Sequence, residues 1–194
     1  MKALRILLWL LVAAAAVAFA ALYWRQSTPP ESQAQQVGLG GPFTLIDSKG
    51  QPFASSRLAG RPYALFFGFT HCPDVCPTTL ARLVRLRRQL GTDDAFRIVF
   101  VTVDPERDGP AEVGKYADLF GAPVIGLTGS PAQIAQVKKV FGIFSEKVGT
   151  GDTYTVDHTA AVLLFDKGGQ FQSTIAPDET DAAALAKLRR LTSG

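Results

Sequence analysis

The chain has 194 residues, with 20 Lys and Arg against 17 Asp and Glu and a net charge of +3. This small basic excess contains no Lys/Arg-rich block and argues against nucleic-acid binding. Once an N-terminal segment is set aside, roughly 150 residues remain, the size of one ordinary domain. Thiol chemistry is confined to Cys72 and Cys76, and imidazole chemistry to His71 and His158.

The N-terminal segment is expected to anchor the chain in a membrane. Residues 6–24 contain no charged side chain and, as a helix, approach the ~30 Å thickness of a hydrocarbon core. Lys2 and Arg5 precede this run and Arg25 follows it, so the positive-inside rule exports the rest of the chain. The alternative is a cleaved signal peptide, with a processing site at Ala18-Phe19-Ala20. Both interpretations place the remaining chain on the non-cytoplasmic, periplasmic side.

A flexible linker is expected after the anchor. Residues 26–41 are polar, contain two adjacent prolines and end in glycines, a composition typical of linkers. The predicted organisation is an anchor at 1–25, a linker at 26–41 and one folded domain at 42–194. Tethering would raise the effective concentration of the domain toward a membrane-bound partner.

Short apolar runs alternating with amphipathic segments predict an α/β domain. In chain order, the expected elements are a hairpin of 43–46 and 51–53, a buried strand at 63–69, a helix at 78–90, a buried strand at 97–103, helices beginning at Pro110 and at the capping box of Ser130, strands at 159–165 and 170–175, and a final helix near 185–191. The first strand–helix–strand unit requires parallel strands, and the later hairpin adds antiparallel ones. The predicted fold is thioredoxin-like, with an N-terminal β-hairpin and a helical insertion, preceded by one transmembrane helix.

The segment Cys72-Pro-Asp-Val-Cys76 lies where a buried strand meets a helix. Residues i and i+4 share one face of a helix, so the two sulfur atoms are expected to form a reducible disulfide or to clamp a metal. The N-terminus of the helix would favour a thiolate at Cys72. A structural disulfide between such close neighbours would constrain the unfolded chain little. Thiol or metal chemistry is therefore favoured.

Two histidines are candidates for a third metal ligand. Two thiolates are too few for a structural zinc site, whereas thiolates with an imidazole suit copper, as Cu(I) or as Cu(II). His158 opens the strand expected beside the cysteine helix. His71 adjoins Cys72, and its ring would have to bend back beside its own neighbour. From spacing alone, a ligand role for His158 and an ordinary hydrogen-bonded role stay equally open.

Three segments together resemble the SCO/SenC family of copper-delivery proteins. They are Phe67–Leu80, Val103–Asp108 and Val156–Thr159. The resemblance covers about residues 42–192. It implies a thioredoxin-like fold and a role in assembling the dinuclear copper centre of cytochrome c oxidase.

The resemblance also implies site residues. It assigns Cys72, Cys76 and His158 as the copper ligands. Asp157 is a candidate partner for the ring of His158, because metal-bound imidazoles commonly donate their second N–H to a carboxylate or carbonyl. The segment Asp104–Asp108 follows a strand and is expected at the same edge, either shaping the pocket or meeting a partner, or else forming a charged turn with its own ion pairs.

Three functions fit these residues. The first is a metallochaperone, not an enzyme, that delivers one copper to the copper-accepting subunit of cytochrome c oxidase and depends on a copper donor and a thiol reductant. The second is a thiol–disulfide oxidoreductase that reduces the cysteines of that subunit. Thioredoxin-type oxidoreductases resemble one another in a cis proline before the strand opposite the cysteines, and residues 154–159 contain no proline, which counts against this function. The third is a redox or copper sensor.

Overall fold

The computed structural model describes Trp9 and residues 39–92 and 94–193. Apart from Trp9, the predicted anchor lies outside the described residues, as does most of the predicted linker. Among the residues that are described, none of the helices has the length and apolar character needed to cross a membrane. Gly38–Gly194 form one compact unit, whose fold follows.

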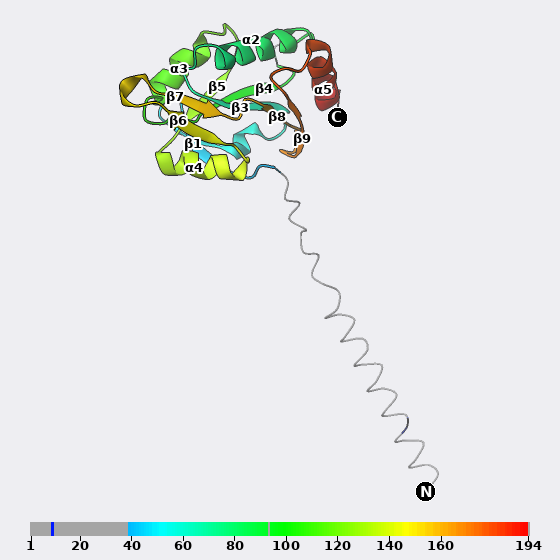
Figure 1. Cartoon of the computed structure of the whole chain (residues 1–194). Helices are drawn as coiled ribbons and strands as arrows, with labels where there is room; N and C mark the ends of the chain where they lie inside the picture. Colours follow the sequence, from blue (N-terminus) through cyan, green and yellow to red (C-terminus); the bar gives the residue numbers. More distant parts are fainter. Residues whose placement is uncertain (1–8, 10–38, 93, 194) are drawn as a thin grey trace. The chain divides into compact units, whose positions relative to one another are not determined.

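A seven-stranded mixed sheet occupies the middle of this unit (Figure 1). In spatial order the strands are β2 (Pro52–Ala54), β1 (Thr44–Asp47), β5 (Ile125–Thr128), β4 (Arg97–Thr102), β3 (Tyr63–Gly68), β8 (Val162–Phe165) and β9 (Phe171–Ile175). Strands β3, β4 and β5 are parallel, and the other neighbours pair antiparallel. This parallel centre with antiparallel edges is the predicted thioredoxin-like α/β arrangement.

Strands β3 and β4 form the middle of the core. All six residues of β3 are buried, as are five of the six in β4. Continuous apolar runs of this kind are typical of parallel strands that are covered on both faces. The helices α2 (Val75–Arg88) and α4 (Pro131–Val140) lie on opposite sides of the sheet (Figure 1). Two more helices, α3 (Pro110–Asp118) and α5 (Asp181–Ser193), pack near β5 and β9.

Local signals predicted the first hairpin and two helix starts correctly. Asp47 Oδ1 accepts two backbone N–H groups of its own turn, and Gly50 takes a φ of 74° there. Pro110 is in the first turn of α3. Ser130 and Gln133 form the reciprocal capping box of α4. In each case the contact that stabilises the turn or helix start lies within a few residues of the sequence motif that predicted it.

Three short strands of the structure were not predicted from the sequence. No strand is predicted for β5, which is short and contains a glycine, or for the polar segment β6 (Ser145–Val148). The third is β7 (Thr155–His158), which pairs with β6 in a separate two-stranded sheet. The strand predicted at 159–165 begins only at Val162, as β8. Tertiary pairing stabilises such polar strands, and His158 therefore ends β7 instead of opening a strand of the main sheet.

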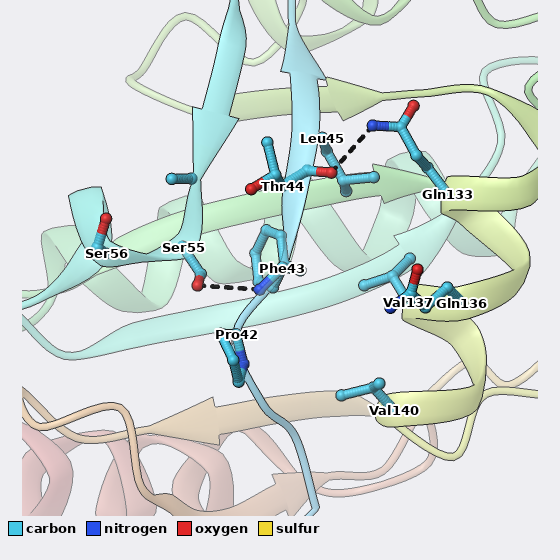
Figure 2. A pocket seen from close by; sticks show the side chains of 11 residues that line it. Pro42, Phe43, Thr44, Leu45, Ser55, Ser56, Gln133, Gln136, Val137 and Val140 are labelled. Carbon is cyan, nitrogen blue, oxygen red and sulfur yellow. Dashed lines mark hydrogen bonds between the residues drawn. The ribbon is translucent and has the colours of Figure 1, made fainter.

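A surface pocket of about 490 Å³ lies between the start of β1 and α4 (Figure 2). Two polar side chains in it bond to the backbone: Ser55 Oγ accepts from the N–H of Phe43 at 3.1 Å, and Gln133 Nε2 donates to the carbonyl of Thr44 at 3.1 Å. The lining contains neither cysteine nor histidine. These hydrogen bonds stabilise the β1–β2 hairpin and its contact with α4. The pocket lining offers no soft metal ligand.

Candidate metal centre

The two cysteines lie at the junction of β3 and α2. The helix begins at Val75, with Asp74 as its N-cap, three residues before the predicted start. Cys76 therefore lies in the first helical turn, whereas Cys72 lies on the preceding loop. The backbone N–H of Cys76 donates to the Sγ of Cys72 at 3.4 Å. The helix N-terminus thus points an N–H group at this sulfur, as the sequence predicts.

Cys76 is part of the apolar core, with 0% of its surface exposed. Gly68, the last residue of β3, makes room for its sulfur, because a Cβ at Gly68 would lie 2.8 Å from Cys76 Sγ. Burial raises the pKa of the Cys76 thiol, and the adjacent Cys72 sulfur raises it further. The free thiol is consequently protonated at neutral pH, and a metal that binds there must displace the proton.

His158 reaches the cysteines from the end of β7. Its Nε2 lies 3.4 Å from Cys76 Sγ, and its Nδ1 lies 3.0 Å from the carbonyl oxygen of Thr159. A carbonyl can only accept a hydrogen bond, so Nδ1 carries a proton, and the tautomer of the neutral ring that fits this contact has its lone pair at Nε2. This is the tautomer that allows Nε2 to bind a metal beside the sulfur.

Two phenylalanine rings hold the imidazole of His158. The rings of Phe66 and Phe69 meet it edge-on, with centroid distances of 6.1 and 5.9 Å. Asp157, the predicted partner of the ring, is exposed. Neighbouring side chains of a strand point to opposite faces, and the carbonyl of Thr159 takes the expected place of Asp157.

The structure brings together the three residues that the sequence predicts as copper ligands. One ligand atom from each of Cys72, Cys76 and His158 lies within 4.8 Å of the other two. Within the described part of the chain, these residues form the one such group of His, Cys, Asp and Glu side chains. A groove of about 260 Å³, lined in part by Cys72 and His158, opens beside them. Two soft sulfurs and one imidazole fit copper and are too few for a closed zinc site.

His71 does not join this group. Its Nδ1 lies 3.1 Å from the hydroxyl of Thr70 and 3.5 Å from the carboxylate of Asp108. Its side chain is 53% exposed. Of the two histidines that the sequence offers, the structure therefore places only His158 beside the sulfurs.

A buried carboxylate fixes the loop that leads to Cys72. Asp108 has a fully buried side chain and accepts from the N–H and the hydroxyl of Thr70 at 2.8 and 2.6 Å. It also accepts from the hydroxyl of Thr102, at the end of β4, at 2.6 Å. Asp108 was expected near the site as part of the 104–108 segment. The contribution of Gly68 was not predicted, although a glycine in an apolar run is a signal of close approach.

Comparison with known proteins shows the family of the chain. The family model described as SCO1/SenC matches residues 31–193. The mitochondrial SCO2 homolog of Mus musculus is 35% identical over 173 residues, which cover 86% of this chain and 68% of the mouse protein. Mitochondrial SCO2 of Saccharomyces cerevisiae is 37% identical over 158 residues, 79% of this chain but about half, 52%, of the yeast protein. Copper-bound ScoI of Bradyrhizobium japonicum is similar in structure, with a TM-score of 0.71 and 42% identity over 79% of this chain and 99% of ScoI. The chain belongs to the SCO1/SenC family.

Proposed function

We propose that this chain is a copper metallochaperone for the assembly of cytochrome c oxidase. It would hold one copper through Cys72, Cys76 and His158 and pass the ion to the copper-accepting subunit. The convergence of these three donors within 4.8 Å carries the proposal. The copper bound to the ScoI relative supports the choice of metal. Membership of the SCO1/SenC family supports the role in oxidase assembly that the sequence resemblance implies.

The uneven burial of the donors suits a site that must release its metal. Cys76 is buried, whereas Cys72 and His158 are half-buried at the groove. Two thiolates hold Cu(I), and the imidazole adds affinity for Cu(II). A thiolate of the partner would replace Cys72 or His158 first, while Cys76 retains the ion until a second partner ligand arrives. Each thiol of this chain gives up its proton on loading and regains one on release.

Redox state would control loading. The two sulfurs lie within 4.8 Å of each other, so movement of the Cys72 loop toward Cys76 would permit a disulfide, which leaves no thiolate for copper. Two electrons and two protons from a thiol reductant restore the dithiol. Copper delivery would therefore need a reducing partner as well as a copper donor.

The proposal includes attachment to a membrane. The uncharged run at 6–24 and its flanking basic residues support an N-terminal anchor with the copper site on the non-cytoplasmic side. This arrangement would keep the site near a membrane-bound oxidase. The cleaved signal peptide remains the alternative and leads to the same compartment.

A thiol–disulfide oxidoreductase is the second candidate, because the two sulfurs differ in access. Half-buried Cys72 would attack a partner disulfide, and Cys76 would then attack the mixed disulfide and free the reduced partner. The burial that raises the pKa of Cys76 opposes this second step. Such exchange also has no need of His158.

Copper binding by the reduced, full-length chain tests the proposal. Under argon, we expect one copper per chain and an absorption band from thiolate-to-copper charge transfer. The variant His158→Ala should bind weakly or show an altered band. His71→Ala is the matched control and should behave like wild type, because His71 lies outside the donor group. If the wild-type chain does not bind copper stoichiometrically, or if His158→Ala binds copper as wild type does, thiol–disulfide exchange would be favoured instead.

A further inference from the structure

We infer that Arg107 is a positioning residue that holds His158 beside the cysteines. It acts through Tyr154, on the hairpin that carries His158, and does not contact the metal. The consequence for copper affinity rests on the proposed function. The effect on the hairpin itself does not rest on the proposed function, and it can be measured without copper.

The hairpin of β6 and β7 needs such a contact. Among the described strands, these two pair only with each other, and a two-stranded hairpin is marginally stable alone. Of its eight residues only Val156 is buried. Lys147 pairs with Glu106, but these side chains are 46% and 60% exposed, and such surface pairs contribute little. Apart from the buried Val156 and the phenylalanine rings around His158, the position of the hairpin therefore depends on contacts at the ends of its strands.

Arg107 makes such a contact at Tyr154, directly before β7. Its Nη1 donates to the carbonyl oxygen of Tyr154 at 3.0 Å. Its guanidinium carbon lies 3.6 Å from the centroid of the Tyr154 ring, within the range of a cation–π interaction. The side chain of Arg107 is only 17% exposed. One guanidinium thus fixes both the backbone and the ring of a residue four positions before His158.

Asp104 holds this pair in place. Its buried carboxylate accepts from Arg107 Nε at 2.5 Å through Oδ2 and from the Tyr154 hydroxyl at 2.7 Å through Oδ1. The three side chains therefore form a closed triangle in which each contacts the other two. A charged pair with this little exposure is screened weakly by water, and its geometry restricts the position of the hairpin.

The same turn reaches the other half of the site. The hydroxyl of Thr102 accepts from the N–H of Asp104 at 2.9 Å and donates to Asp108 at 2.6 Å. Asp108 in turn holds Thr70, two residues before Cys72. The segment 104–108 thus contacts both the loop that carries Cys72 and the hairpin that carries His158. The sequence left open whether it shapes the site or forms a charged turn, and its contacts favour the first.

The reasoning predicts a loss of affinity when the triangle is broken. Metal ligands must be held within about 0.5 Å of the productive geometry, and residues that orient a ligand typically affect affinity by about 10- to 100-fold. Cys76 belongs to the core, whereas His158 belongs to a hairpin outside the main sheet. The triangle of Arg107, Asp104 and Tyr154 adds to the contacts of the His158 ring with Phe66 and Phe69 and helps to keep the ligands in position.

Three variants of the full-length chain test the inference. Arg107→Ala removes the guanidinium. Tyr154→Phe removes only the hydroxyl bond to Asp104 and keeps the ring. Arg82→Ala is the matched control, because Arg82 is 15% exposed and pairs with Asp181 at 2.8 Å but holds α5. We would measure Cu(I) affinity by chelator competition, amide hydrogen exchange of the copper-free protein, and the melting temperature. The affinity and exchange measurements would be repeated in a His158→Ala background.

We expect Arg107→Ala to lower Cu(I) affinity by about 10-fold and to speed exchange at the amides of β6 and β7. Tyr154→Phe should act in the same direction with a smaller effect. In the His158→Ala background, the loss of affinity caused by Arg107→Ala should disappear while the faster exchange remains. Arg82→Ala should lower the melting temperature and leave copper affinity and hairpin exchange unchanged.

Unchanged hairpin exchange in both Arg107→Ala and Tyr154→Phe would overturn the inference. So would an equal loss of affinity with and without His158, which would show a general effect on folding. If Arg107→Ala does not fold, Tyr154→Phe decides by the same criteria. If the wild-type chain binds no copper, the proposed function fails, and hairpin exchange alone still decides whether Arg107 positions the hairpin.

Discussion

The space that Gly68 leaves for Cys76 gives the sharpest prediction about the site. In Gly68→Ala, the new Cβ would lie 2.8 Å from Cys76 Sγ and 3.0 Å from Cε2 of Phe100. Ordinary contacts of this kind are roughly 3.5–4.0 Å. The sulfur must therefore move by about 1 Å, because both neighbours are fully buried and a packed core yields little.

This displacement should affect metal binding more than it affects folding. Overpacking a core typically costs about 1–3 kcal/mol, which a domain of this size tolerates. In catalysis a misplacement of about 1 Å lowers the rate by up to about 100-fold, and loss of groups that orient metal ligands lowers metal affinity by about 10- to 100-fold. We expect Gly68→Ala to remain folded and to bind Cu(I) about 10- to 100-fold more weakly, as measured by chelator competition and by thermal unfolding.

Gly126→Ala supplies the control. A Cβ at Gly126 would lie 2.7 Å from the carbonyl oxygen of Val113, an overlap as severe as that at Gly68. Gly126 is on β5, two strands away from β3 in the sheet, and does not face a sulfur. This variant should lose stability and keep its copper affinity. Wild-type affinity in Gly68→Ala, or an equal loss in Gly126→Ala, would refute the reasoning.

Three further predictions concern the thiols and one buried phenol. Half-buried Cys72 should react with iodoacetamide before Cys76, whose burial raises its thiol pKa; peptide mass spectrometry would contradict this if Cys76 were modified first. Oxidation to the Cys72–Cys76 disulfide should abolish Cu(I) binding and a thiol reductant should restore it, whereas binding by the oxidised chain would exclude a dithiol site. Burial raises the pKa of Tyr63 to about 12, so the stabilising effect of its protonated form is complete below pH 10 and is lost as pH rises from 10 to 12, at about 1.4 kcal/mol per pH unit. In Tyr63→Phe, the free energy of unfolding measured with urea should fall less steeply with rising pH. An equal pH dependence in the variant and the wild type would show that Tyr63 is not the cause.

The parts of the fold that the sequence predicted are those specified locally. The run Tyr63–Gly68 is apolar throughout and forms a strand buried on both faces. The capping box at Ser130 and the turn at Asp47 satisfy their own backbone groups. The polar strand β6 carries no such signal, because β7 supplies its hydrogen bonds. Its existence depends on a partner about ten residues away, and periodicity cannot report that.

The candidate site likewise has a part that the sequence predicts locally and a part that depends on contacts between distant segments. The spacing of Cys72 and Cys76 brings their sulfurs together locally, and the sequence predicted that pair from the residues alone. The juxtaposition with His158 required the family resemblance, since spacing left its role open. The partner of its ring differed from the expected Asp157, because strand alternation turns that side chain away. No local pattern could show that Arg107 stacks on Tyr154, 47 positions later.

The three proposed ligands differ in how firmly each is attached, and this difference bears on release. Cys76 is part of the core, and Cys72 follows a loop that Asp108 holds. His158 stands on a hairpin that, in the described part of the domain, shares no strand pairing with the main sheet. Withdrawal of His158 would therefore break no strand pairing of the main sheet, whereas withdrawal of Cys76 would open the core. If the chain delivers copper as proposed, loss of His158 or Cys72 from the metal would precede loss of Cys76. Under the proposed function, tighter contacts of Arg107 at Tyr154 would favour retention of copper, and looser contacts would favour its transfer.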